Sequence, residues 1–228
     1  MHNLIKYLIL QLLLFISAVL YGQEIKVIKD FRFNGSVGVE KELFDVLEIG
    51  FENSIKLEKN ASEIDEVDFD LRLKYSPFGF FSFGLGYRLA ANHKKSGNYA
   101  WDQRFNADLE FAVKLARFRA GYRIRYQNID DDFFLYDENT PPQHILRNKL
   151  EIRYNIRNCK LSPFIYSEFY GNLNETDEFA FRIKYAVGGR YSFGKYGKFK
   201  AYYRIIRQLN DLYPYTYYNL GIGYVYDF

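Results

Sequence analysis

The stretch Tyr218-Asn-Leu-Gly-Ile-Gly-Tyr-Val-Tyr-Asp-Phe228 decides the fold of this chain. Every second residue from Tyr218 to Phe228 is aliphatic or aromatic, and the residues between them are small or polar apart from Val225. Successive side chains of a β-strand point to opposite faces, so this stretch predicts a strand with one apolar face. That face is aliphatic in the middle and aromatic near residue 228. Such a gradient is typical of a strand whose centre faces hydrocarbon and whose end lies among lipid headgroups.

The same alternation recurs along the chain. In residues 117–127 arginines alternate with apolar side chains, and a helix with its 3.6-residue period would scatter these arginines around its surface. Residues 161–170 carry apolar side chains on both faces, so their orientation stays open. The other predicted strands are residues 31–41, 46–57, 67–75, 81–89, 104–115, 146–156, 181–193 and 199–209.

Short and longer connections alternate between these strands. The short ones fall near residues 42–45, 76–79, 116–117, 157–160 and 194–197, and the longer, polar ones near residues 59–66, 92–103, 128–144, 172–177 and 210–214. Outer-membrane barrels have this asymmetry, with tight turns on the periplasmic side. We therefore predict an all-β fold, a transmembrane up-and-down antiparallel β-barrel. Because single-chain bacterial barrels have even strand numbers, we expect about twelve strands, within a range of ten to twelve, with residues 25–29 as a brief first strand.

The composition is consistent with strands that face lipid on one side and water on the other. Aromatic residues make up 20% of the 228 residues and charged residues 26%, and the mean hydropathy is only −0.31. A soluble lipocalin-type barrel, with apolar residues inside, would show the same alternation and is the alternative. The aromatic terminal strand, the grouping of the long loops at one end and the secretory start of the chain favour lipid outside.

Residues 1–22 differ from the rest of the chain. Lys6 precedes a nearly continuous apolar run, and Gly22 provides a cleavage point before Gln23. This pattern predicts a secretory signal peptide over residues 1–22 and a barrel domain over residues 23–228, the alternative being an uncleaved helical anchor. The formal net charge is +3, from 31 Lys and Arg against 28 Asp and Glu. This balance argues against nucleic acid as a partner.

Several short motifs resemble a Bacteroidota outer-membrane family known only as a domain of unknown function, number 2490 of its series. They are the segments Val37–Leu43, Leu85–Arg88, Tyr122–Tyr126, Leu146–Leu150 and Leu220–Tyr226. The resemblance implies a small barrel in the bacterial cell outer membrane and contributes no catalytic residues. The last strand also resembles the closing strand of outer-membrane barrels. That likeness implies that Tyr224, Tyr226 and Phe228 form the signal read by the barrel-assembly machinery.

Charged residues on the predicted inward faces divide along the chain. The acidic set is Glu48, Glu52, Asp68, Asp70, Asp108 and Glu110, and the basic set is Arg117, Arg119, Arg123, Arg125, Arg147, Lys149, Arg153, Arg182, Lys184 and Arg204. In a closed barrel an acidic wall would then meet a basic wall. If the side chains reach one another they form a salt-bridged plug, and if water separates them they line a narrow charged pore. We favour the plug, because about twelve strands leave limited space inside.

No motif for a cofactor, a metal or a catalytic residue is evident, so we expect a non-enzymatic barrel whose partners are outer-membrane lipid and lipopolysaccharide. Two alternatives remain. A rim-sited lipid hydrolase or acyltransferase could use His93 or His144, but no serine can be paired with either from the sequence. A surface-binding module could act on an unknown partner through residues 128–144, which contain acidic residues followed by Phe133–Tyr136.

Overall fold

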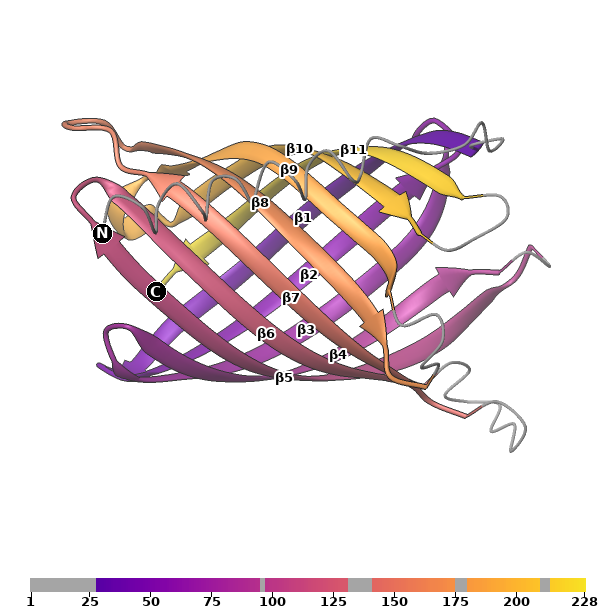
Figure 1. The fold of residues 1–228 in the computed structure, drawn as a ribbon, viewed down its shortest axis with the longest axis horizontal. Helices are drawn as coiled ribbons and strands as arrows, with labels where there is room; N and C mark the ends of the chain where they lie inside the picture. Colours follow the sequence, from indigo (N-terminus) through magenta and orange to yellow (C-terminus); the bar gives the residue numbers. More distant parts are fainter. Residues whose placement is uncertain (1–27, 95–96, 131–140, 175–179, 210–213) are drawn as a thin grey trace, which may run out of the picture.

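The computed structural model describes residues 28–94, 97–130, 141–174, 180–209 and 214–228, which form one closed barrel of eleven strands (Figure 1). The strands are β1 (Ile28–Phe44), β2 (Leu47–Glu58), β3 (Glu63–Phe78), β4 (Phe81–His93), β5 (Tyr99–Leu115), β6 (Phe118–Asp130), β7 (Gln143–Tyr154), β8 (Leu161–Asn172), β9 (Ala180–Ser192), β10 (Lys198–Gln208) and β11 (Tyr215–Asp227). A short 3-10 helix, η1 (Gly194–Tyr196), lies between β9 and β10. Among the described residues no helix has the length and apolarity needed to cross a bilayer. The predicted signal segment lies outside the described residues.

Each strand pairs with its neighbours in the chain, and β1 pairs with β11 to close the barrel. All pairs are antiparallel except β1–β11, which is parallel. The prediction of a wholly antiparallel barrel with an even strand number is therefore wrong at this seam, although eleven lies within the expected range. An odd number of strands in up-and-down order makes the first and last run in the same direction. Ile28 and Lys29 belong to β1, and residues 25–27 of the proposed extra strand lie outside the described residues.

The two ends of the barrel differ as predicted. Tight turns at residues 45–46, 79–80 and 116–117 lie at the end where β11 also finishes, at the left in Figure 1, and we call this the short-turn end. Several strands are longer than predicted at the opposite, long-loop end. β3 starts at Glu63 and β5 at Tyr99, in segments that the sequence placed in loops. The backbone ladder needs no apolar side chain, so it continues past the lipid-facing alternation.

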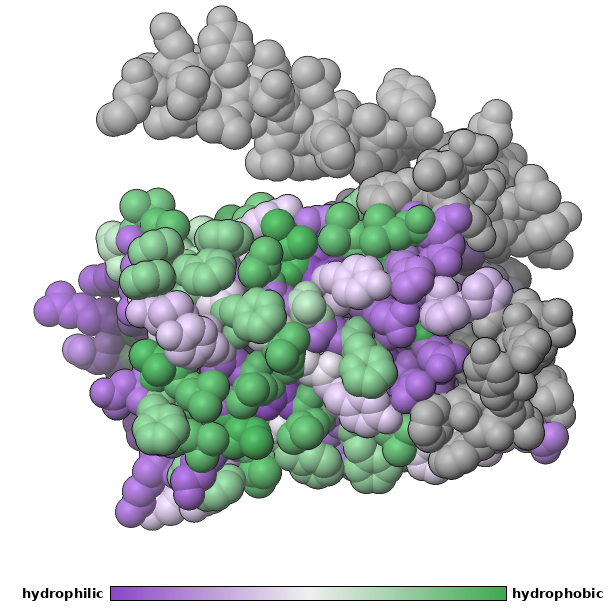
Figure 2. Space-filling model, turned by 90° about the horizontal axis from the view of Figure 1, so that it is seen from below, coloured by the Kyte–Doolittle hydropathy of each residue, from purple (hydrophilic) through white to green (hydrophobic). Residues whose placement is uncertain are grey.

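Apolar side chains cover the outside of the barrel. Large hydrophobic residues from every strand are exposed, among them Phe51, Leu71, Leu85, Ile165 and Val187. Figure 2 shows hydrophobic residues over the central part of one face, with hydrophilic residues towards the ends. Charged residues occupy the inward positions, and the bulk of the buried side chains are polar or charged. This is the arrangement expected of a barrel with lipid outside, and it is the reverse of a lipocalin-type barrel.

A small aromatic cluster fills part of the lumen. It consists of Phe164, Tyr166 and Ala186, with Tyr202 packed against them. The cluster resolves the orientation of β8, which the sequence left open: Phe164 and Tyr166 point inward. The lumen accommodates these rings because glycines stand beside them. A Cβ on Gly221 would overlap the ring of Tyr202, whose hydroxyl accepts a hydrogen bond of 2.8 Å from Asn34 Nδ2.

Replacing Gly221 by valine should therefore destabilise the barrel. The new side chain would displace Tyr202 from Asn34 and overfill the lumen, at a cost of roughly 1 to 3 kcal/mol. The measurement is the thermal midpoint of the detergent-solubilised barrel, followed by heat-modifiable gel migration. Gly79→Val is the matched control, since a Cβ on Gly79 meets nothing within 4 Å. Equal midpoints for the two variants would contradict this role of Gly221.

Candidate functional site: the charged lumen

Strand register places like charges opposite one another on the basic side of the lumen. Arg123 lies opposite Lys149, and Arg125 lies opposite Arg147. Like charges directly opposite on neighbouring strands repel, so this wall requires carboxylates nearby. Two glutamates outside the predicted set supply them.

Glu168 and Glu151 are these two carboxylates. Glu168, on β8, is 4% exposed and accepts hydrogen bonds from Arg123 Nη2 at 2.9 Å and Arg147 Nη2 at 2.8 Å. Glu151, on β7, pairs with Lys149, with Arg153 and with Arg190 of β9. Alternation within residues 146–156 could have identified Glu151 as inward-facing. Glu168 could not have been identified, because the orientation of its strand was unresolved.

The acidic wall likewise contains its own cations. Asp68 and Asp70 are 1% and 2% exposed and lie beside Arg88, whose guanidinium is 2.7 Å from Asp70. Arg72 bonds both Asp70, at 2.7 Å, and Glu52, at 3.0 Å. Further pairs on this wall join Lys56 to Glu66, Lys74 to Glu110, and Arg104 to Glu66 and Asp102. The carboxylates of each wall are thus paired largely with cations of the same wall.

The predicted acidic and basic sets meet at one ion pair among the described residues. Arg125 donates two hydrogen bonds to Asp108, from Nε and Nη2, each of 2.6 Å. Both side chains are about 11% exposed. Two parallel bonds between a guanidinium and a carboxylate form the strongest geometry available to such a pair. This contact joins β5 to β6 where the two walls adjoin.

Other members of the predicted network have no ion pair. Arg117 lies in the β5–β6 turn and is exposed, because β6 begins only at Phe118. Arg119 is exposed at the short-turn end, and Glu48 is half-buried; neither has an ion-pair partner among the described residues. Arg204 instead donates a hydrogen bond of 3.1 Å to Asn219 and stacks over Tyr202. Assigning Arg117 to the lumen was therefore incorrect.

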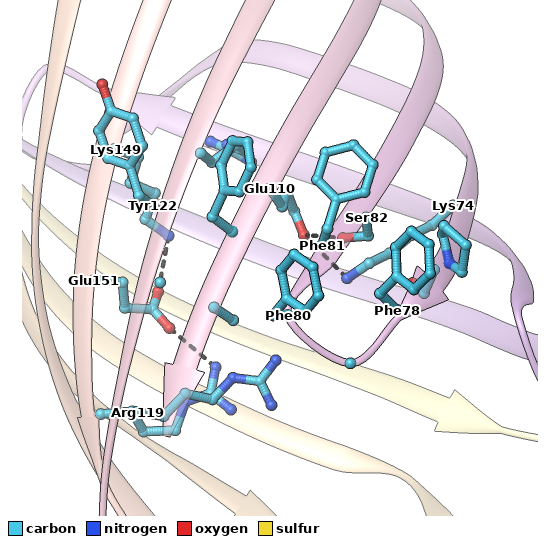
Figure 3. A pocket seen from close by; sticks show the side chains of 18 of the residues that line it. Lys74, Phe78, Phe80, Phe81, Ser82, Glu110, Arg119, Tyr122, Lys149 and Glu151 are labelled. Carbon is cyan, nitrogen blue, oxygen red and sulfur yellow. Dashed lines mark hydrogen bonds and ion pairs between the residues drawn. The ribbon is translucent and has the colours of Figure 1, made fainter. Parts of the chain in front are cut away.

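Side chains fill the middle of the lumen. Asp68, Asp70, Glu168 and Asn219 come from strands β3, β8 and β11, spread around the circumference, and are each less than 9% exposed. A continuous water-filled channel would expose such inward residues. Open space lies instead towards the short-turn end, in a cavity of about 780 Å³ that we call the vestibule (Figure 3).

The long-loop end contains the two histidines considered for catalysis. His144 Nδ1 lies 2.7 Å from the hydroxyl of Tyr126, and His93 Nδ1 lies 3.4 Å from Glu58. Within the described part of the chain, neither imidazole forms a hydrogen bond with a serine. Glu58, Glu63 and His93 also place potential metal-ligand atoms within 4.8 Å of one another, a grouping the sequence did not indicate. Arg32 pairs with Glu58, and Lys59 pairs with Glu63, so both carboxylates already have cationic partners.

The three aromatic residues of the expected assembly signal lie at the end of β11. Tyr226 and Phe228 are exposed and stack with their ring centroids 6.4 Å apart. Tyr224 is half-buried, and its hydroxyl donates a hydrogen bond to the carbonyl of Tyr196. Lys41 of β1 lies 4.8 Å from the centre of the Phe228 ring.

The ion pair between Arg125 and Asp108 should contribute measurably to the stability of the barrel. Arg125→Gln leaves the buried Asp108 carboxylate without this cation, so we expect unfolding to become easier by roughly 3 kcal/mol. The substitution also removes the repulsion between Arg125 and Arg147, so the loss of stability should lie at the lower end of the range for breaking a buried ion pair. Arg119→Gln, on the same strand but exposed and without an ion pair, should change stability by less than about 0.5 kcal/mol. Denaturant unfolding in detergent measures both, and similar losses would refute the assignment.

Comparisons with known proteins identify a family. The family model described as Protein of unknown function (DUF2490) matches residues 32–211, which include the charged residues of the lumen. Among solved structures, LpxR from Salmonella typhimurium is similar, with a TM-score of 0.47 and 9% sequence identity over 78% of this chain and 83% of that chain. No curated protein sequence matches the chain. The family match spans most of the chain and agrees with the resemblance of its hairpin motifs, so the protein belongs to the family of proteins of unknown function DUF2490.

Proposed function

We propose that this protein is a non-enzymatic β-barrel of the bacterial outer membrane whose lumen is closed by its own side chains. The observation that supports the proposal is that the burial of charged and apolar residues is the reverse of that in a soluble protein. Charged residues in the middle of the lumen are buried, whereas large apolar residues on the outside are exposed. Only a surrounding of lipid makes such an exterior favourable, since a patch of this extent would drive association in water.

Exposed aromatic residues at both ends of the barrel support a membrane location. At the short-turn end exposed rings pair along the rim, as in Phe78–Phe80 and Tyr191–Phe193. At the opposite end Tyr99 and Trp101 are exposed. Aromatic residues are enriched at both membrane interfaces because their rings are apolar with a polar edge. Outer-membrane lipid and lipopolysaccharide are accordingly the partners we propose for the outer surface.

Closure of the lumen follows from charge pairing and packing together. Glu168, Asp108 and Asp70 each hold arginines across neighbouring strands. The aromatic cluster around Phe164 occupies further space. An ion would have to break several buried ion pairs to pass, and each broken pair leaves an uncompensated charge in a medium of low dielectric constant. A structural or surface role fits such a barrel better than solute transport does.

The proposal predicts that the protein fractionates with outer membranes, migrates on gels in a heat-modifiable way and conducts little current. Planar-bilayer recording of the purified barrel should show no steady large conductance, with a known porin as the positive control. Recovery as a soluble protein without detergent would reject the membrane assignment. A stable, large conductance would reject the closed lumen while leaving the membrane assignment intact.

We further propose that the aromatic end of β11 is recognised by the barrel-assembly machinery. Phe228 is exposed and contacts Tyr226 and Lys41 near the rim, so its loss removes little packing. Deleting Phe228 should reduce the amount of folded barrel in membranes several-fold and leave refolding in detergent nearly unchanged. Phe228→Tyr, which keeps an aromatic ring, should behave as the unmodified protein. If membrane assembly and detergent refolding fall together, Phe228 has only a structural role.

A further inference from the structure

The vestibule has a strongly basic wall. The residues that line it include Arg119, Lys149, Arg153, Arg190 and Lys200, from strands β6, β7, β9 and β10. Glu151 is the carboxylate on this wall, and it pairs with Lys149, Arg153 and Arg190. Figure 3 shows Arg119, Lys149 and Glu151 on one side of the cavity, with Lys74 and Glu110 on the other. The opposite wall is closer to balance, since Lys74 pairs with Glu110 there.

Glu151 neutralises only part of this positive charge. Its oxygens lie 2.8 Å from Lys149, 3.0 Å from Arg153 and 2.9 Å from Arg190, so one negative charge is shared by three cations. Arg119 and Lys200 have no carboxylate partner among the described residues. Arg153 Nε is buried without a hydrogen-bond acceptor. The wall therefore has both excess charge and a spare donor.

Strand register concentrates the excess charge. Arg119 lies directly opposite Arg153 across the β6–β7 ladder, and Arg190 lies directly opposite Lys200 across the β9–β10 ladder. Like charges that lie directly opposite on neighbouring strands destabilise a sheet. Two such pairs around a single carboxylate are favourable only if an anion or well-ordered water compensates them.

An aromatic surface backs this wall. Phe164 is 2% exposed, and its ring is approached by the guanidinium of Arg190 at 4.9 Å and by the ammonium of Lys200 at 5.4 Å. These contacts hold the two cations in place beside the vestibule. Phe164 belongs to the buried cluster that fills part of the lumen. The cavity is thus a blind pocket and not part of a continuous channel.

We propose that the vestibule is a binding site for a soluble, multiply charged oxyanion of the phosphate type. Three guanidinium groups present planar pairs of donors, the geometry that matches phosphate oxygens, and two ammonium groups add point charges. An anion with two or more charges would neutralise the cations that Glu151 leaves unpaired. A cavity of about 780 Å³ has room for such an anion together with water. Strands surround the site, which favours a soluble anion over a lipid headgroup.

This inference goes beyond the proposed function and depends on it in one respect, because a closed lumen makes the site one of binding rather than passage. The two can fail separately. Absence of anion binding by a non-conducting barrel would overturn the anion site alone. Large conductance would overturn the closed lumen alone.

The test is calorimetric titration of the full-length, detergent-solubilised protein with inorganic pyrophosphate at low ionic strength. We expect saturable binding at one site, weakened by added sodium chloride because screening reduces the attraction. Arg119→Gln and Lys200→Gln should each reduce the affinity about tenfold, the usual effect of losing one charge-assisted contact. Arg117→Gln removes an equal charge two residues from Arg119 but outside the vestibule, and it should bind as the unmodified protein does. If the Arg117 and Arg119 variants lose affinity for pyrophosphate equally, the effect depends only on overall charge, and the proposed site is overturned.

Two further titrations, one with a Glu151 variant and one with citrate, test the specificity of binding. Glu151→Gln removes the competing carboxylate, so pyrophosphate should bind several-fold more tightly and raise the thermal midpoint of this variant more than that of the unmodified protein. A loss of affinity in a folded Glu151→Gln barrel would overturn the proposal. Citrate carries similar charge without phosphate geometry and should bind at least tenfold more weakly. Equal binding of citrate would overturn the assignment to phosphate-type anions.

Discussion

The structure depends on one electrostatic constraint: a carboxylate buried inside the barrel must be paired with a cation. Asp68, Asp70 and Glu168 lie almost completely out of contact with solvent, and transferring an unpaired charge to such a site costs several kcal/mol. Cations therefore accompany each carboxylate, from neighbouring strands more often than from across the lumen. Because the outside of the barrel is apolar, the lumen is also the place where charge can be accommodated along the length of the strands. Charge pairing inside the barrel and exposure of apolar side chains outside it are thus two consequences of the same alternation.

Packing inside the lumen follows from this arrangement. Large rings such as Tyr202 and Phe164 enter the space that inward-facing glycines leave open, and Gly188 and Gly221 stand beside them. The rings carry polar edges or support cations on their faces, so they fit among charged neighbours better than aliphatic side chains would. Ion pairs and rings together close the middle of the barrel. Towards the short-turn end, cations outnumber carboxylates around Glu151. This excess of positive charge is the basis for the anion site proposed in the vestibule.

The two ends of the barrel are therefore different surfaces. The long-loop end contains compensated clusters, in which Arg32 and Lys59 already neutralise the acidic groups near His93. The short-turn end presents a cavity with more cations than carboxylates. A closed barrel with an anion-binding vestibule at one end would interact with lipid on its outer surface and with soluble anions through one opening. This division of roles follows from the side chains and does not require passage of solute through the lumen.

The sequence by itself determined the strand alternation, the asymmetry of the connections and, for strands other than β8, the face that carries the apolar side chains. These properties are local, because the two-residue period of a strand assigns a face to each side chain wherever the strand pairs. It also identified most charged residues of the lumen, with Arg117 assigned wrongly because the strand begins one residue later. Tertiary structure alone decided the parallel β1–β11 seam, the inward face of β8 and the partner of each charge. Glu168 meets Arg123 and Arg147 only after β6, β7 and β8 pair in their register. Ion pairing depends on distances across strands, and no period within a single strand contains that information.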